Sequence, residues 1–231
     1  MKKVLVMSHE RSGTHFLIDS IAANFGYDSN VIDFHIEDSN DISNKRTLEY
    51  RERVQQKVKE LYPLNTNQIF KSHRDVKFFD GMLDELKDNF HIFYIERAVC
   101  DVLTSCYHYY NIPQLTHFPQ EKDVVKFLEL VPYKYVTDGA YSFTKSENQV
   151  LRWKNHVEGW RSAGVTVITY ESLNNNFVLC MDVVASVLGV APTSCTQPSL
   201  GGVAPRKGVV GDHKNLFTPE QIRYINETST A

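Results

Sequence analysis

Hydrophobic residues along this chain occur as short runs rich in β-branched residues, separated by stretches whose apolar positions have helical spacing. The runs fit buried strands, and they cover Val4–Met7, Val31–Phe34, Gln68–Lys71, His91–Ile95 and Val165–Thr169. Apolar residues three and four positions apart predict helices that start at Phe16 and that cover Thr47–Leu61, Gly81–Lys87, Val99–Tyr110, Glu147–Ser162 and Met181–Leu188. Strands alternating with helices predict a single α/β domain over residues 1–231, with a mostly parallel central sheet flanked by helices.

Three segments lack either pattern, and they cover Glu37–Lys45, Pro113–Lys145 and Ala191–Val210. Loops of this length inside a compact domain are usually functional or disordered. The middle segment is rich in aromatic residues, namely Phe118, Phe127, Tyr133, Tyr135, Tyr141 and Phe143. These rings either line a binding site for a small molecule or belong to the core, and the sequence leaves both interpretations open.

Composition and charge narrow the classes of protein. An apolar fraction of 42% and a charged fraction of 23% are typical of a water-soluble globular chain. A net charge of -3 argues against a broad basic surface for nucleic acid, so any anion site must be a local cluster. No apolar run is long enough to span a bilayer and the chain begins directly with a strand, which predicts no membrane association, no signal peptide and a cytoplasmic location. The four cysteines have no CxxC spacing, so no metal site is predicted.

The segment from Ser8 to Thr14 carries the most specific signal in the chain. It is a polar turn between a buried strand and a helix, and it contains Arg11, Ser12 and Gly13. Unpaired N–H groups at a helix start favour an anion, and a glycine there lets the backbone approach a phosphate closely. The turn is not a Walker A loop, because no glycine lies five residues before Gly13 and no lysine follows it. An ordinary strand-to-helix turn, capped by a hydroxyl, remains the alternative.

Two further clusters favour an anion. Arg97 ends a predicted strand, and Ser105 lies eight residues further on, two turns into the next helix. A guanidinium suits bidentate contact with phosphate, although Arg97 can instead pair with Asp101 at the helix start. Near the end of the chain, the Arg206–Gly208 tripeptide places two cations and a glycine in one loop, which suits a compact anion clamp.

These segments together are similar to the sulfotransferases that use 3′-phosphoadenosine 5′-phosphosulfate (PAPS). The order R-S-G-T-x-aromatic resembles their P-loop-like phosphosulfate-binding turn, and R-x-x-x-D-V-x-x-S-x-Y, which starts at Arg97, resembles their motif for the nucleotide 3′-phosphate. The C-terminal segment resembles the family's R-K-G-x-x-G-D-W-K-N-x-F-T, with His213 in place of the tryptophan. The resemblance covers about residues 4–17, 69–73, 92–110, 150–173 and 206–218.

The resemblance implies PAPS as the sulfuryl donor, 3′-phosphoadenosine 5′-phosphate (PAP) as the product, a small-molecule acceptor and no metal. The family's nucleotide contacts map onto Arg11, Ser12, Gly13, Thr14, His15, Phe16, Arg97, Ser105, Tyr170, Arg206, Lys207 and Gly208. Ile69–His73 is similar to the family's K-T-H segment, which gives His73 the role of general base toward a hydroxyl or amine of the acceptor. Arg11 stands where the family has a catalytic lysine or arginine, and Lys71 adds positive charge nearby.

Some departures and alternatives stay open. Phe16 replaces a tryptophan that stacks on adenine in many family members. The family's dimerisation motif is matched at Lys214 and Thr218 but not at Pro219 and Arg223, so the oligomeric state is not predicted. A P-loop nucleotide or small-molecule kinase would instead use ATP and magnesium, and a non-catalytic nucleotide-binding protein would keep the fold without turnover.

Overall fold

A computed structural model describes residues 2–34, 48–64, 66–115, 120–131, 147–199 and 208–230. Its strands are β1 (Lys3–Ser8), β2 (Asp28–Asp33), β3 (Gln68–Ser72), β4 (Phe90–Glu96) and β5 (Thr166–Thr169). Its helices are α1 (Thr14–Phe25), α2 (Leu48–Glu60), α3 (Leu83–Asn89), α4 (Val99–Tyr110), α5 (Val124–Glu129), α7 (Gln149–Ser162), α8 (Tyr170–Asn175), α9 (Phe177–Leu188) and α10 (Pro219–Thr230). Short 3₁₀ turns cover Val76–Phe79 and Asp212–Asn215.

The five strands form one parallel sheet in the order β2-β3-β1-β4-β5, which confirms the predicted fold class. β1 lies in the centre, where Met7 is in register with Ser72 on one side and with Tyr94 on the other. Every residue of β1 is buried. A central parallel strand is covered on both faces, which explains why its sequence is an apolar run without alternation.

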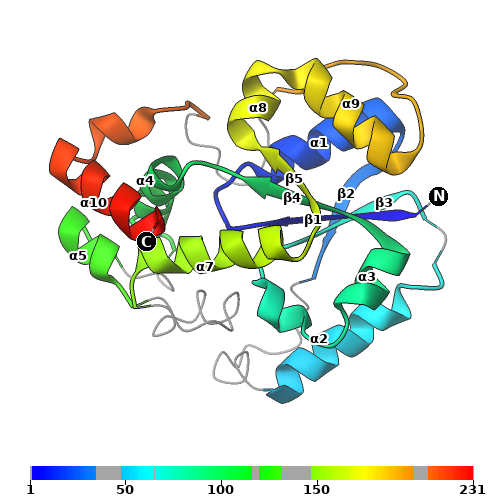
Figure 1. Ribbon diagram of the computed structural model, residues 1–231, viewed down its shortest axis with the longest axis horizontal. Helices are drawn as coiled ribbons and strands as arrows, with labels where there is room; N and C mark the ends of the chain where they lie inside the picture. The colour runs from blue at the N-terminus through cyan, green and yellow to red at the C-terminus, as the bar shows by residue number, and fades with distance from the viewer. Residues whose placement is uncertain are drawn as a thin grey trace.

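Helices cover both faces of the sheet, as Figure 1 shows. Val4 and Val6 of β1 point to the face packed by α1, α8 and α9. Leu5 and Met7 point to the opposite face, where they join a cluster with residues of α2, α3 and α7. Successive side chains of a strand alternate between faces, so one strand contributes to both clusters.

A third apolar cluster joins α4, α5, α7 and α10. The sequence prediction was wrong for α5, which lies within the segment expected to be irregular, and it contained neither α8 nor α10. Phe127 of α5 is buried in this cluster, so its ring belongs to the core. Of the other aromatic residues in that segment, Phe118, Tyr133, Tyr135, Tyr141 and Phe143 lie outside the described residues.

Helix ends follow local sequence rules. Gly189 ends α9 in the left-handed conformation with a φ of 68°, as a glycine after the last apolar position predicts. Thr218 accepts a hydrogen bond from the N–H of Gln221, and Pro219 takes the first position of α10, where its missing N–H costs nothing. Thr218, which matches the family's dimerisation motif, therefore has a structural role in starting this helix.

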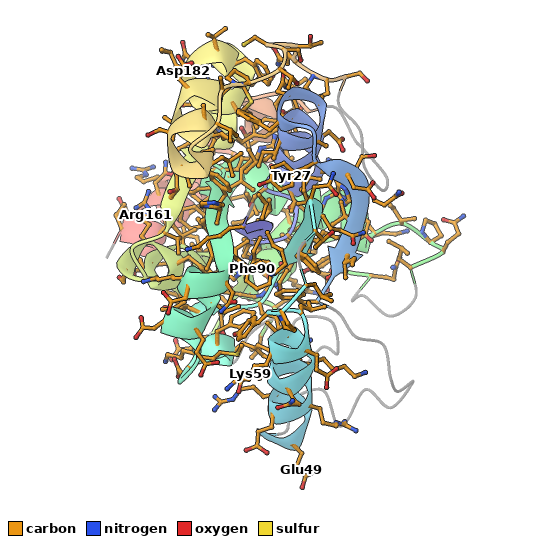
Figure 2. The ribbon with its side chains drawn as sticks, turned by 90° about the vertical axis from the view of Figure 1, so that its right-hand side faces the viewer. Tyr27, Glu49, Lys59, Phe90, Arg161 and Asp182 are labelled. Carbon is orange, nitrogen blue, oxygen red and sulfur yellow. The ribbon has the colours of Figure 1, made fainter. Side chains whose placement is uncertain are left out.

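Several helices carry charged side chains on the outside of the molecule. Figure 2 shows Glu49 at the outer end of α2 and Asp182 on the outer side of α9, whereas Phe90 and Tyr27 lie in the interior. Of the helices in the described ranges, none combines the length and the hydropathy needed to cross a membrane.

Candidate active site

The residues that the sequence singled out meet at the carboxyl ends of the parallel strands. The turn Ser8–Thr14 follows β1, and His73, Arg97 and Tyr170 follow β3, β4 and β5 respectively. Ligands of open parallel sheets bind at this edge. The topology therefore brings together groups that are far apart in the chain, and the site is built from them.

The turn after β1 has the conformation of an anion site. Arg11 and Gly13 both have left-handed backbones, with φ values of 65° and 94°, and α1 begins at Thr14. When left-handed residues alternate with residues of other backbone conformations, successive N–H groups point into one concavity. The positive end of the helix dipole at the start of α1 adds to the attraction for an anion there. The hydroxyl oxygen of Ser12 is buried and has no hydrogen-bond partner among the residues that the structure describes. An anion oxygen at this turn would give that hydroxyl a partner.

Gly13 is required both by its conformation and by its surroundings. A Cβ atom at this position would lie 2.4 Å from Cδ2 of Tyr170, closer than any van der Waals contact allows. Tyr170 is buried, and its ring makes an edge-type contact with Phe16, with the ring centroids 6.0 Å apart. Phe16 is itself only 3% exposed, so in this structure its ring packs in the core and supports Tyr170.

We expect Gly13→Ala to lower the free energy of unfolding by more than Gly189→Ala does. Both substitutions force alanine into a left-handed backbone, at a cost of about 1–2 kcal/mol. Only Gly13 also meets a ring, because nothing lies within 4 Å of a Cβ at Gly189. Urea unfolding of both variants measures the difference, and equal losses would contradict the close approach of Tyr170.

The Arg11 guanidinium is held from α4. Its Nε donates to the hydroxyl of Ser105 at 3.1 Å, and its Cζ lies 4.6 Å from the ring centroid of Tyr109. Ser105 and Tyr109 are four residues apart and therefore share one face of the helix. The sequence prediction included Ser105 and missed Tyr109, which shares its helix face.

Arg97 and Tyr170 form a second unit with the C-terminal segment. The Arg97 guanidinium lies 4.5 Å from the Tyr170 ring centroid and donates from Nη2 to the carbonyl of Val209 at 2.9 Å. The Tyr170 hydroxyl donates to the carbonyl of Gly208 at 2.6 Å. Arg97 Nε is buried without a hydrogen-bond partner within the described ranges, as Ser12 Oγ is. Arg206 and Lys207 lie outside the described residues.

Asp101 anchors the same C-terminal segment. Its carboxylate accepts hydrogen bonds from the N–H of Gly211 at 2.7 Å and from Nδ1 of His213 at 2.7 Å. Burial opposes ionisation, yet these hydrogen bonds lower the pKa of Asp101 below its usual value. The pairing of Arg97 with Asp101, considered from the sequence, is therefore replaced by a contact between Asp101 and the loop, made in part by the histidine that replaces the family's tryptophan.

His73 lies against the turn with a defined tautomer. Its Nδ1 is 3.1 Å from the carbonyl oxygen of Ser8, and a carbonyl only accepts, so Nδ1 carries the proton and Nε2 carries the lone pair. The hydroxyl of Ser8 joins this Nδ1 to the hydroxyl of Thr14 through contacts of 3.1 and 2.7 Å. Burial and the ammonium of Lys71 lower the pKa of His73, so the imidazole is neutral at pH 7.

Behind the turn lies a buried polar cluster that the sequence prediction missed. The carboxylate of Glu10 accepts two hydrogen bonds from the guanidinium of Arg152, at 2.5 and 2.6 Å, and a third from the hydroxyl of Tyr110 at 3.2 Å. Although burial opposes it, Arg152 holds the pKa of Glu10 well below its usual range. Arg152 is 1% exposed, so α7 fixes the turn from inside the protein.

The same cluster places ligand atoms of His9, Glu10 and Cys106 within 4.8 Å of one another. A cation there would face the guanidinium of Arg152, which already occupies both oxygens of Glu10. Like charges in a buried site repel strongly, so the arrangement suits an ion pair and not a metal.

Acid is expected to destabilise the protein between pH 7 and pH 5. Burial lowers the pKa of His9 to about 4, whereas the unfolded chain protonates this residue near 6.5. The unfolded state therefore binds more protons across this window, and stability falls as the pH falls, by about 2 kcal/mol from His9 alone. His73 and His156, whose pKa values burial also lowers, act in the same direction. Urea unfolding at pH 7, 6 and 5 measures the loss, and a constant free energy of unfolding would contradict it.

A family model described as the sulfotransferase domain matches residues 1–200. The chain belongs to the sulfotransferase domain family. The resemblance drawn from the sequence is thereby confirmed, and with it the enzyme class, the transfer of a sulfuryl group. The match also favours this class over the kinase alternative, as does the absence of a Walker A sequence at the turn.

Solved structures confirm the sulfotransferase fold. A mouse sulfotransferase in complex with PAP matches with a TM-score of 0.66 at 22% identity, over 98% of this chain and 83% of that one. Retinol dehydratase in complex with retinol and PAP matches with a TM-score of 0.64 at 18% identity, over 99% and 80% of the two chains. Retinol dehydratase in complex with androsterone and PAP matches with a TM-score of 0.62 at 17% identity, over 99% of this chain and 79% of that one. No curated protein matches the sequence. Identities this low establish a shared fold and not a shared substrate.

The strand order separates the predicted site residues into two groups. The turn Arg11–Thr14 lies with Arg97, Ser105, Tyr170 and Gly208 on the side of β1, β4 and β5. His73 and Lys71 lie on the side of β3 and β2. The Lys71 ammonium is 2.9 Å from the carboxylate of Asp33, a residue that the sequence prediction did not include.

Proposed function

We propose that the protein transfers the sulfuryl group of PAPS to a hydroxyl or an amine of a small-molecule acceptor, with His73 as the general base. The observation that carries the proposal is the position of a neutral, oriented imidazole directly beside an anion-binding turn. PAPS binding is supported by PAP in the structural neighbours and by the fit of the turn to an anion.

The nucleotide would lie over β1, β4 and β5. The N–H groups of the turn and the hydroxyls of Ser12 and Thr14 would hold the 5′-phosphosulfate. Arg97 and Ser105 would hold the 3′-phosphate, since a guanidinium suits bidentate contact with a dianion. Tyr170 would lie beside the adenine. Arg206 and Lys207 remain part of the proposed nucleotide site on the sequence resemblance alone.

The acceptor would approach from the side of β3. His73 Nε2 takes the proton of the acceptor hydroxyl while the acceptor oxygen forms a bond to sulfur, and the bond from sulfur to the bridging oxygen breaks. The electron pair of that bond goes to the leaving phosphate, whose charge Arg11 stabilises. Lys71 adds positive charge close to the equatorial oxygens. Fixed cations and positioning thus supply most of the catalysis, as in phosphoryl transfer.

A thermal-shift experiment tests the nucleotide site without an acceptor. PAP at one hundred times its Kd is expected to add about 2.7 kcal/mol of stability, and ADP or ATP with magnesium is expected to add much less. Arg97→Ala should remove most of the gain from PAP, because it removes the contact with the 3′-phosphate. Arg161→Ala, at an exposed arginine on α7, serves as the matched control. Stabilisation by ATP with magnesium alone would refute the proposal in favour of a kinase.

A further inference from the structure

The acceptor side of the sheet edge is lined by charged and polar groups. β2 and β3 are neighbours in the sheet, and Asp33 and Lys71 are paired in register at their carboxyl ends. His73 follows β3 directly and lies two residues after Lys71, so this pair lies next to the proposed base. His15, in the first turn of α1, lies close enough to Lys71 and Asp33 to interact electrostatically with both. Together these groups determine the chemical surroundings of the acceptor.

The ion pair between Lys71 and Asp33 is accessible but not fully hydrated. The two charged atoms are 2.9 Å apart, and the side chains are 15% and 27% exposed. A molecule that reaches His73 from this side would displace the remaining water from the pair. Removing water from two charges is costly unless the incoming molecule forms hydrogen bonds in its place.

His15 and Asp19 extend the polar lining along α1. They lie four residues apart on one helix face. Burial lowers the pKa of His15, as does the charge of Lys71, while Asp19 and Asp33 oppose it. The imidazole of His15 is therefore neutral at pH 7 and lies within electrostatic reach of both members of the ion pair. It adds one further donor and acceptor to the same side.

We propose that the acceptor is a neutral polyhydroxylated molecule, of the saccharide or cyclitol class, whose hydroxyl adjacent to the sulfated one bridges Asp33 and Lys71. This inference rests on the proposed function. A hydroxyl donates one hydrogen bond and accepts another, so a single hydroxyl satisfies a carboxylate and an ammonium at once. Lys71 would repel a cationic acceptor, and Asp33 would repel an anionic one. An apolar alcohol would remove water from the pair and return no hydrogen bond.

The proposal distinguishes this chain from structural neighbours that bind retinol or androsterone, both of which are largely apolar. It also explains why Asp33 lies beside a cation that sulfuryl transfer needs. Asp33 acts here as a specificity-determining residue. Its carboxylate would hold the acceptor through a second hydroxyl, and this orients the first hydroxyl toward Nε2 of His73.

A series of three cyclic alcohols tests the proposal on the full chain. Cyclohexanol, trans-1,2-cyclohexanediol and myo-inositol share one ring and differ in the number of neighbouring hydroxyls. Formation of PAP from PAPS gives kcat/KM for each, and thermal shifts with PAP present give binding without turnover. We expect the diol and myo-inositol to exceed cyclohexanol by about tenfold or more, because the added hydroxyl bonds to charged groups.

Asp33→Asn should reduce this preference to about twofold or less, since it removes the charge while keeping the shape. The preference is the ratio of kcat/KM for the diol to kcat/KM for cyclohexanol. An effect of the substitution on Lys71 that slows all acceptors equally therefore leaves this ratio unchanged. Asp28→Asn, at the opposite end of β2, is the matched control and should keep the full preference, because its contact with the N–H of Asn30 needs only an oxygen acceptor.

Two results would overturn the acceptor class. One is the lack of a preference for the diol in both rate and binding, and the other is a preference that Asp33→Asn leaves intact. Failure of the proposed function itself has a different signature. In that case PAP would not stabilise the chain and PAPS would not be consumed with any acceptor.

Discussion

Replacing His73 with alanine is expected to slow sulfuryl transfer by about 10²- to 10⁴-fold, the usual contribution of a general base, while the affinity for PAP stays unchanged. The imidazole has its Nδ1–H held by the carbonyl of Ser8, which leaves the lone pair on Nε2 to take a proton from the acceptor. The nucleotide contacts come from other elements, so binding should survive. Steady-state turnover with PAPS and thermal shifts with PAP measure the two properties separately.

His91→Ala is the matched control for this experiment. His91 lies near the start of β4, at the end of the sheet opposite the site, and is only partly buried. Its substitution should leave both turnover and PAP affinity close to those of the unchanged protein. Turnover that persists in His73→Ala would remove the base assignment. Loss of PAP affinity in that variant would instead give His73 a role in holding the turn.

Arg152→Met is expected to lower the free energy of unfolding by about 3–5 kcal/mol, the cost of leaving a buried charge without its partner. Glu10 would lose two hydrogen bonds from the guanidinium and keep the hydroxyl of Tyr110. The pKa of Glu10 should then rise, because burial alone disfavours its charge. Urea unfolding at pH 7 measures the loss.

A double substitution separates the two causes of the stability loss in Arg152→Met, namely the unpaired charge of Glu10 and the changed packing. Adding Glu10→Gln to Arg152→Met removes the unpaired carboxylate, so a large part of the lost stability should return. Arg161→Met provides the exposed comparison, because Arg161 is 57% exposed in its pair with Glu96, and it should cost about 1 kcal/mol or less. An equal loss for Arg152→Met and Arg161→Met would show that the buried pair contributes no more than a surface one.

Local patterns were sufficient for the parts of the fold that depend on neighbouring residues. The three inner strands, β1, β3 and β4, were found because their apolar runs are largely buried in the middle of a parallel sheet. β2 was predicted to begin at Val31 and instead begins at Asp28, since its partly exposed start is not apolar. α5 was missed because it is six residues long and begins on a cap from Asp123, too short for a helical period to register.

In the candidate site too, local patterns predicted the residues of single segments and missed contacts between segments. Arg11, Gly13 and Thr14 lie in one turn, so a single segment of sequence indicated an anion site. His73 and Arg97 were found at strand ends, where the motif resemblance and the parallel-sheet rule agree. Tyr109 was missed although it lies on the same helix face as Ser105, because its role depends on where Arg11 reaches from another element.

Local sequence was enough to indicate an α/β sulfotransferase and to predict an anion site in the turn after the first strand, because both inferences rest on contiguous residues and on the period of apolar positions. The surroundings of that turn depend on how distant segments pack together. Glu10 and Arg152 are 142 residues apart, and no local pattern pairs them. The tautomer of His73 and the ion pair of Lys71 with Asp33 likewise depend on which strands are neighbours in the sheet. Side-chain partners of this kind are set by packing in three dimensions, and they determine how the site binds and reacts.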